Sequence, residues 1–295
     1  MALSIAFLSA ILRSLLNIID RKSFGLNRDK VLPTLIINNL YPLMLLLFIG
    51  IVGGQIGSAL VYLTDTSLIV LGLLFQLTAY AFSLSFRHMK VQEVILVSKM
   101  ADLFIPLILW LLLNAFNPFA YAGTVFTTLI CIPLVVSHRQ NRKDFLIPAL
   151  MTLVFNSLQG GFSKWLLPVT DRYVEDLVPI TLVIIFWRLI FSLLFHFLTR
   201  LSRNKDSNAI RLNDFRFKPL QLLRSIITLA VQISFVTAIY LAKNNFLIWP
   251  ILNSTILFSI IFSGMMLKEK VELKYYLVTS VIILVVFLTG YLHSF

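Results

Sequence analysis

Long apolar runs, separated by short polar segments, make up most of this chain. Each run holds about 20 mostly apolar residues, the length that an α-helix needs to cross a bilayer. Some runs are only a few residues apart, as at "FRHMKVQ" (86–92) and "AKNN" (242–245), so consecutive helices must be antiparallel neighbours. The pattern predicts ten helices, near 2–20, 31–52, 66–86, 91–114, 118–137, 143–166, 177–199, 219–242, 245–267 and 273–293.

Composition agrees with an all-α integral membrane protein of ten transmembrane helices. The 295 residues are 59% hydrophobic and 13% charged, whereas a soluble globular chain is about 25% charged. The net charge of +12 would suit a nucleic-acid binder, but the basic residues lie mostly in short loops, so we expect a lipid bilayer and no nucleic acid as partner. The single cysteine, Cys131, excludes an intramolecular disulfide and argues against a cysteine-based metal site.

The basic residues also predict an orientation. The loops on one side of the ten predicted helices hold 18 Lys and Arg residues, and those on the other side hold 3. Lys and Arg are enriched in cytoplasmic loops, so this count places both termini outside. The one long polar segment, 200–218, then becomes a cytoplasmic loop. We expect an integral protein of the bacterial inner membrane.

The two halves of the chain resemble each other. "RSLLNIIDRK" (13–22) matches "NSLQGGFSKW" (156–165) in hydropathy at an offset of 143, and "LILWLLLNAF" (107–116) matches "IIFSGMMLKE" (260–269) at an offset of 153. Five helices per half is an odd number, so the second half must be inverted relative to the first. We therefore predict two inverted five-helix repeats, 1–140 and 141–295, a common architecture of secondary transporters.

The C-terminal pair of helices, "WPILNSTILFSIIFSGMMLKEKVELKYYLVTSVIILVVFLTGYL" (249–292), resembles the drug/metabolite transporter superfamily in its ten-helix EamA-like branch. Leu267, Glu269 and Lys270 fit the Leu-x-Glu-Lys pattern of that family. The resemblance extends to "LVSKMADLFIPLILWLLLN" (96–114), with Pro106 at a typical place, and to "FNSLQGGFSKWLL" (155–167). It implies a transporter with a polar cavity between its halves.

Two features depart from the resembled family. Asn114 and Ala115 stand where the first half should carry its glutamate. The family usually keeps both termini in the cytoplasm, whereas the loop charges of this chain favour termini outside.

Four charged residues lie near the middle of predicted spans, where ionised groups are costly. Arg13, Lys99 and Arg188 outweigh Asp102 and give these deepest groups a net charge of +2, of which Asp20 could offset one. An unpaired buried charge is strongly unfavourable, so the surplus predicts an anionic substrate group. Asp102 could bind a substrate ammonium group or act as the proton-coupling site.

Further polar and aromatic side chains at bilayer depth complete the predicted substrate site. Other interpretations stay open: the Lys99–Asp102 pair could only neutralise itself, the amides could join helices, and the aromatic residues could serve packing. The predicted substrate-binding residues are Arg13, Asn17, Tyr41, Gln76, Tyr80, Lys99, Asp102, Asn156, Gln159, Trp187, Arg188, Gln232, Tyr240 and Asn253.

These patterns predict a secondary active transporter of a small anionic or zwitterionic metabolite, such as an amino acid or a phosphorylated metabolite. We expect alternating access, coupled to protons through Asp102, without a cofactor or a metal and without enzymatic activity, since no catalytic motif occurs. A monomer would suffice, and a dimer is compatible with the sequence. The alternatives are a flippase-like handler of a phosphate-bearing lipid carrier and a membrane scaffold or receptor that transports nothing.

Overall fold

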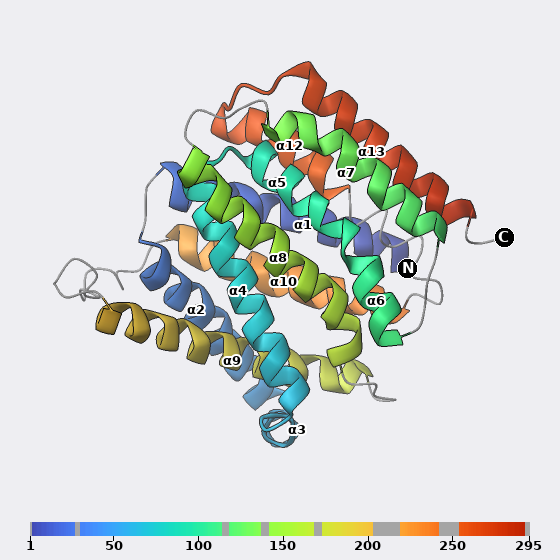
Figure 1. Ribbon diagram of the computed structural model, residues 1–295. Helices are drawn as coiled ribbons and strands as arrows, with labels where there is room; N and C mark the ends of the chain where they lie inside the picture. Colours follow the sequence, from blue (N-terminus) through green and yellow to red (C-terminus); the bar gives the residue numbers. More distant parts are fainter. Residues whose placement is uncertain are drawn as a thin grey trace.

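The computed structural model describes residues 2–26, 30–113, 118–136, 142–167, 173–202, 219–241 and 254–292, and every element within them is a helix (Figure 1). The helices are α1 (Ala2–Asp20), the π-helical η1 (Arg21–Leu26), α2 (Val31–Val52), α3 (Ile56–Tyr62), α4 (Thr66–His88), α5 (Val91–Met100), the 3₁₀-helical η2 (Ala101–Leu103), α6 (Ile105–Leu113), α7 (Pro118–Val136), α8 (Arg142–Leu166), α9 (Tyr173–Ser202), α10 (Pro219–Leu241), α12 (Thr255–Leu267) and α13 (Leu273–Leu292).

The helix boundaries follow the predicted ranges closely. The helix expected at 31–52 begins and ends at those residues, and the one expected at 177–199 is extended at both ends as α9. Three features were not predicted: the π-helical η1, the short helix α3, and the division of the 91–114 helix into α5, η2 and α6. Residues 203–218, most of the predicted polar loop, and residues 242–253 lie outside the described part.

The long helices are those of an integral membrane protein. Six stretches are long and apolar enough to cross a bilayer: Leu3–Leu26, Val31–Val52, Thr66–His88, Val91–Leu112, Asp144–Ser163 and Glu175–Thr199. Shorter apolar helical stretches occur at Tyr121–Pro133, Pro219–Phe235, Thr255–Leu267 and Leu273–Val285. Large apolar side chains such as Phe48, Leu111 and Leu284 are more than half exposed, as expected of faces that contact lipid.

Helices from the two halves of the chain pack on one another. In the first half, α1 packs on α10 and α12, while α8 of the second half packs on α4, α5 and α6. The pairs α2–α9 and α7–α13 each join one helix from either half, and both pairs lie side by side in Figure 1. The halves are therefore interleaved rather than separate.

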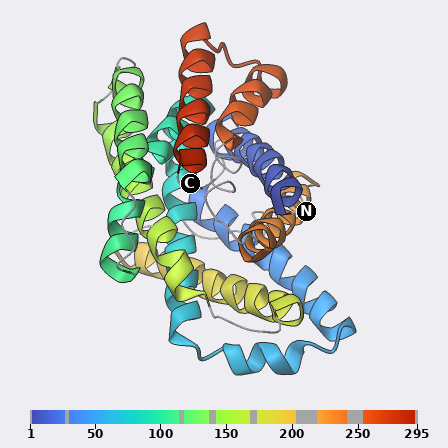
Figure 2. The same cartoon turned by 90° about the vertical axis from the view of Figure 1, so that its right-hand side faces the viewer.

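The bundle has two ends, here named after elements that lie there. At the η1 end, α1 runs into η1, α4 ends and α5 begins; at the α3 end, α2 ends and α4 and α9 begin. Figure 2 shows α3 and the α12–α13 connection at opposite ends of the molecule. One buried apolar cluster, with Phe24, Phe86 and Val91, lies toward the η1 end, and a second, with Leu68 and Ile180, lies toward the α3 end.

The break between α5 and α6 has a local cause. A proline inside a helix lacks an N–H for the carbonyl four residues earlier and clashes with it. Pro106 therefore cannot bond the Asp102 carbonyl, and the chain narrows to the 3₁₀ turn of η2 at residues 101–103. The break places Lys99 and Asp102 beside non-α-helical backbone, deep in an apolar segment.

Two serines link the two halves of the chain through equivalent hydrogen bonds. Ser14 of α1 donates toward the carbonyl four residues earlier in its own helix (2.7 Å) and toward that of Thr255 at the start of α12 (3.0 Å). Ser157 of α8 donates toward the carbonyl four residues earlier (2.7 Å) and toward that of Ala101, at the start of η2 (3.2 Å). The sequence match at an offset of 143 pairs these two serines.

A charged cluster ties the helices together at the η1 end. Arg21 donates from Nε to Glu269 Oε1 (2.9 Å) and from Nη1 to the carbonyl of Phe86 (2.7 Å). Glu269 also accepts from the backbone N–H of Val91 (3.3 Å). Lys268, which ends α12 in the left-handed conformation (φ 55°), directs the chain so that Glu269 faces Arg21.

Candidate functional site: a polar cavity between the halves

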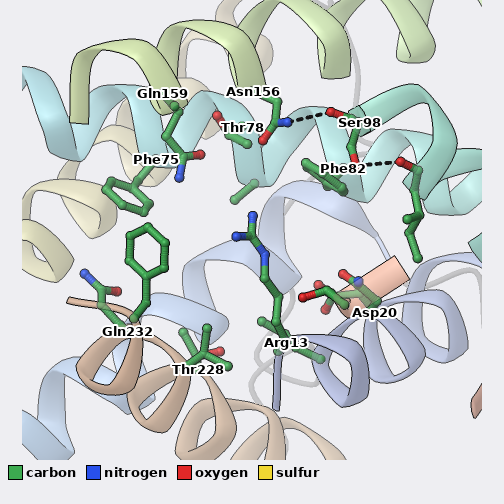
Figure 3. A pocket seen from close by; sticks show the side chains of 18 of the residues that line it. Arg13, Asp20, Phe75, Thr78, Phe82, Ser98, Asn156, Gln159, Thr228 and Gln232 are labelled. Atoms are coloured by element: carbon green, nitrogen blue, oxygen red, sulfur yellow. Dashed lines mark hydrogen bonds between the residues drawn. The ribbon is translucent and has the colours of Figure 1, made fainter. Parts of the chain in front are cut away.

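A cavity of about 260 Å³ lies within the bundle, between the two apolar clusters. Residues of α1, α4, α5, η2, α6, α8, α9, α10 and α12 line it, so both halves of the chain contribute. Figure 3 shows side chains converging on it from opposite sides, with Arg13 and Gln232 facing Thr78, Asn156 and Gln159. An enclosed hollow lined by apolar side chains, with polar groups converging on it, is typical of a small-molecule site.

The structure brings most of the predicted site residues together here. The predicted residues that line the cavity are Arg13, Asn17, Lys99, Asp102, Asn156, Gln159, Arg188 and Gln232. They come from α1, α5, η2, α8, α9 and α10, which are far apart in the sequence. Four other predicted residues, Tyr41, Gln76, Tyr80 and Trp187, are absent from the described lining. Asn253 and the side chain of Tyr240 lie outside what the structure describes.

Gln76 and Trp187 connect helices. The fully buried Gln76 accepts through Oε1 from Asn39 Nδ2 (2.9 Å), and the same amide nitrogen donates to Ser192 Oγ (2.8 Å), so this cluster joins α4, α2 and α9. Trp187 donates from its indole nitrogen to the carbonyl of Leu63 (3.0 Å), just beyond α3. Tyr80 packs against the apolar cluster at the η1 end. These contacts match the alternative interpretation of such residues as packing and interhelical hydrogen bonding.

Lys99 and Asp102 form an ion pair in the cavity wall. Lys99 Nζ lies 3.1 Å from Asp102 Oδ2, and both side chains are largely buried, with 15% and 21% of their surface exposed. The three-residue spacing places them on one face across the end of α5. Their local charges therefore cancel in this conformation.

Asp20 and Arg224 form a second buried ion pair. The Arg224 guanidinium donates from Nε to Asp20 Oδ1 and from Nη2 to Oδ2 (3.0 Å), a bidentate arrangement that joins α1 to α10. Arg224 lines the cavity and was not among the residues predicted from the sequence. It lies five residues after Pro219, the first residue of α10, where a basic residue is easily taken for an extension of the polar loop.

Arg13 and Arg188 are the cavity arginines without an anionic partner in the described part of the chain. Arg13 makes no hydrogen bond or ion pair with any described residue, and its guanidinium points into the middle of the cavity in Figure 3. Arg188 is 7% exposed, lies 5.9 Å from the ring centroid of Phe75, and has no partner for Nε. These two arginines carry the surplus positive charge that the sequence predicted.

The amides of the site are partly engaged. Asn156 donates to the carbonyl of Ser98 (2.9 Å), as drawn in Figure 3, and Asn17 donates to Ser259 Oγ (3.1 Å). Gln232 is 6% exposed and its Nε2 has no partner among the described atoms. The site therefore offers more donors than the surrounding described residues use.

Among the described residues, no group of three or more His, Cys, Asp or Glu side chains is placed to hold a metal ion. The chain matches no protein-family model and no curated protein sequence. The chemistry of the cavity is therefore the guide to function.

Proposed function

We propose that this protein is a secondary active transporter that moves a small anionic or zwitterionic metabolite across the membrane by alternating access. The observation that carries the proposal is the cavity of about 260 Å³ in which Arg13 and Arg188 lack an anionic partner among the described residues. Unpaired charges in an apolar bundle are costly. A substrate anion that binds both arginines would offset that cost during each transport cycle.

The interleaved packing supports a ten-helix, inverted-repeat architecture like that of the drug/metabolite transporters. If α1 corresponds to α8, α4 to α10, and α5 with α6 to α12, the packing of α1 on α10 and α12 has its counterpart in the packing of α8 on α4, α5 and α6. The matching hydrogen bonds of Ser14 and Ser157 follow the same correspondence. The broken helix at η2 beside the cavity also supports this architecture, since transporter sites commonly lie at discontinuous helices between repeats.

The unpaired arginines weigh against a scaffold or receptor that transports nothing. Such a protein would be expected to satisfy Arg13, Lys99 and Arg188 through neighbouring side chains, yet only Lys99 is paired with a described carboxylate. The modest cavity volume favours a small metabolite over a lipid carrier, because pockets for drug-sized ligands already reach about 300–1,000 Å³.

A ligand screen followed by transport tests the proposal. Purified protein in detergent would be melted in the presence of amino acids, nucleotides and sugar phosphates, since a ligand stabilises the state that it binds. The best stabiliser would then be assayed for uptake into proteoliposomes. We expect uptake by the wild type and by Arg87→Gln, whose exposed side chain lies outside the described cavity lining. We expect none by Arg188→Ala, and normal uptake by a folded Arg188→Ala protein would refute the assignment.

A further inference from the structure

The two carboxylates that line the cavity indicate which class of substrate it suits. Asp20 and Asp102 are the acidic residues in the described lining. Both oxygens of Asp20 accept from Arg224, and Oδ2 of Asp102 accepts from Lys99. Each carboxylate is thus already paired with a cation in this conformation, so a substrate ammonium group would have to compete with Arg224 or Lys99 for it.

The donors of the cavity lead to the same conclusion. In the described lining, the buried polar atoms without a partner are Arg188 Nε, Arg224 Nη1 and Gln232 Nε2, all of which carry N–H groups. Buried donors are normally satisfied by an acceptor. Together with the unpaired guanidinium of Arg13, they form a surface suited to several anionic oxygens.

The net formal charge of the cavity lining indicates how much negative charge a bound substrate should carry. Arg13, Lys99, Arg188 and Arg224 against Asp20 and Asp102 leave a surplus of +2. A zwitterion would leave that surplus at +2 and a monoanion at +1, whereas a dianion would cancel it. Because charge is poorly screened inside a low-dielectric bundle, the neutral combination is the most favourable.

The aromatic residues of the lining indicate that the ligand also has an apolar part. Phe75, Phe82, Phe86 and Phe235 all line the cavity, and Figure 3 shows Phe75 and Phe82 on the wall beside Thr78. Aromatic side chains offer flat apolar surfaces for a bound group. A fully hydrated inorganic ion would leave these surfaces unused.

We infer that the cavity binds a small organic dianion, a phosphate monoester or a dicarboxylate, whose anionic oxygens contact the arginines and whose apolar portion lies against the phenylalanines. This inference rests on the proposed function for its place in a transport cycle, but the binding itself can be tested separately. It excludes neutral amino acids as the best ligands.

The test is a set of matched probes titrated in thermal-shift measurements at pH 8. Phenyl phosphate and phthalate are dianions with a ring, benzoate is a monoanion, phenylalanine is a zwitterion, and inorganic phosphate has no ring. We expect phenyl phosphate or phthalate to bind about tenfold or more tightly than benzoate, because one charge-assisted arginine contact fewer costs at least that factor. We expect phenylalanine to be weaker still, and inorganic phosphate to be weaker than phenyl phosphate.

Arg13→Gln and Arg188→Gln should each weaken phenyl phosphate binding by about tenfold or more, and should reduce the ratio of its affinity to that of benzoate. Arg87→Gln, outside the described lining, should change neither the affinity for phenyl phosphate nor this ratio. A pH series on the wild type tests the same point without a variant. The affinity for phenyl phosphate should rise as the pH is raised through about 6, where its phosphate group becomes a dianion. Benzoate, already fully ionised, should show no such rise.

Binding of phenylalanine or benzoate as tight as that of both dianions would overturn the inference while leaving a transporter of another substrate intact. Absence of any shift with both dianions would also overturn it. Tight dianion binding without uptake into proteoliposomes would instead uphold the inference and refute the proposed transport function.

Discussion

Asp20 and Arg224 form a bidentate ion pair that links the last residue of α1 to the first turns of α10, although 204 residues separate them in the sequence. The side chains are 11% and 6% exposed. The pair contributes one positive and one negative charge to the cavity lining, to which Arg188 also belongs. Its integrity should therefore affect both folding and binding.

Asp20→Asn should lower the free energy of unfolding by about 3 kcal/mol, because it leaves the Arg224 guanidinium buried without a counter-charge. Thermal unfolding in detergent would measure the loss. The double variant Asp20→Asn/Arg224→Gln should be more stable than the sum of the single losses predicts, since the uncompensated charge is then removed. Additive losses would show that the pair makes no direct energetic contribution.

Glu269→Gln should destabilise the η1 end of the bundle. The carboxylate is 8% exposed and accepts from both Arg21 and the backbone of Val91, and hydrogen bonds to charged groups contribute about 1.5–3 kcal/mol. Glu272→Gln is the matched control, because the Lys274–Glu272 pair is 40% and 54% exposed and such pairs contribute about 0–1 kcal/mol. Equal melting temperatures for the two variants would contradict the role assigned to Glu269.

Ser14→Ala and Ser157→Ala should cost similar amounts, about 0.5–1 kcal/mol each, because both hydroxyls reach across to the other half of the chain. Ser225→Ala is the control. Ser225 is fully buried but donates within its own helix, to the carbonyl of Gln221 (2.8 Å), and such bonds add little. Unequal effects at Ser14 and Ser157 would weaken the correspondence between the halves.

Asp102→Asn should uncouple transport from the proton gradient if Asp102 carries the coupled proton. Uptake of the best stabiliser into proteoliposomes would be compared with and without an imposed pH gradient, and the variant should retain only downhill exchange. Asp65→Asn is the control, because Asp65 caps α4 by accepting from the N–H of Ser67 (2.8 Å) and asparagine caps as well. A wild-type protein indifferent to the gradient would exclude proton coupling.

The sequence predicted the helices well because each is set by a local property, the length of an apolar run. It also identified Arg13, Lys99, Asp102 and Arg188 as cavity residues, since a charge within an apolar run needs a polar surrounding whatever the fold. The break at η2 was not predicted, although Pro106 was noted as a typical feature. A proline alone does not fix whether a helix kinks or changes its hydrogen-bond pattern.

The remaining site residues depended on tertiary packing. Gln76 lies on a helix that lines the cavity, yet its side chain bonds Asn39 at the interface with α2. The depth of a residue along its helix does not indicate which face of the helix it occupies. Arg224 was overlooked because a basic residue near the start of a helix, after a polar segment, usually reaches the headgroups. Only the approach of α1 to α10 makes it a partner of Asp20.

Alternating access is the central claim, and accessibility from the two sides of the membrane tests it without knowledge of the substrate. Gln159 faces the cavity, and the single native cysteine, Cys131, is fully buried. Gln159→Cys, in a Cys131→Ser background, would be treated with a membrane-impermeant thiol reagent from either side of reconstituted vesicles. Ser83→Cys, buried and outside the described lining, is the control that should not react.

We predict that the cysteine at position 159 reacts from both sides, because the cavity opens alternately to each. A saturating ligand from the screen should slow the reaction on both sides by occupying the same space. Reaction from one side only, whether or not a ligand is present, would contradict alternating access and favour a protein that binds without transporting.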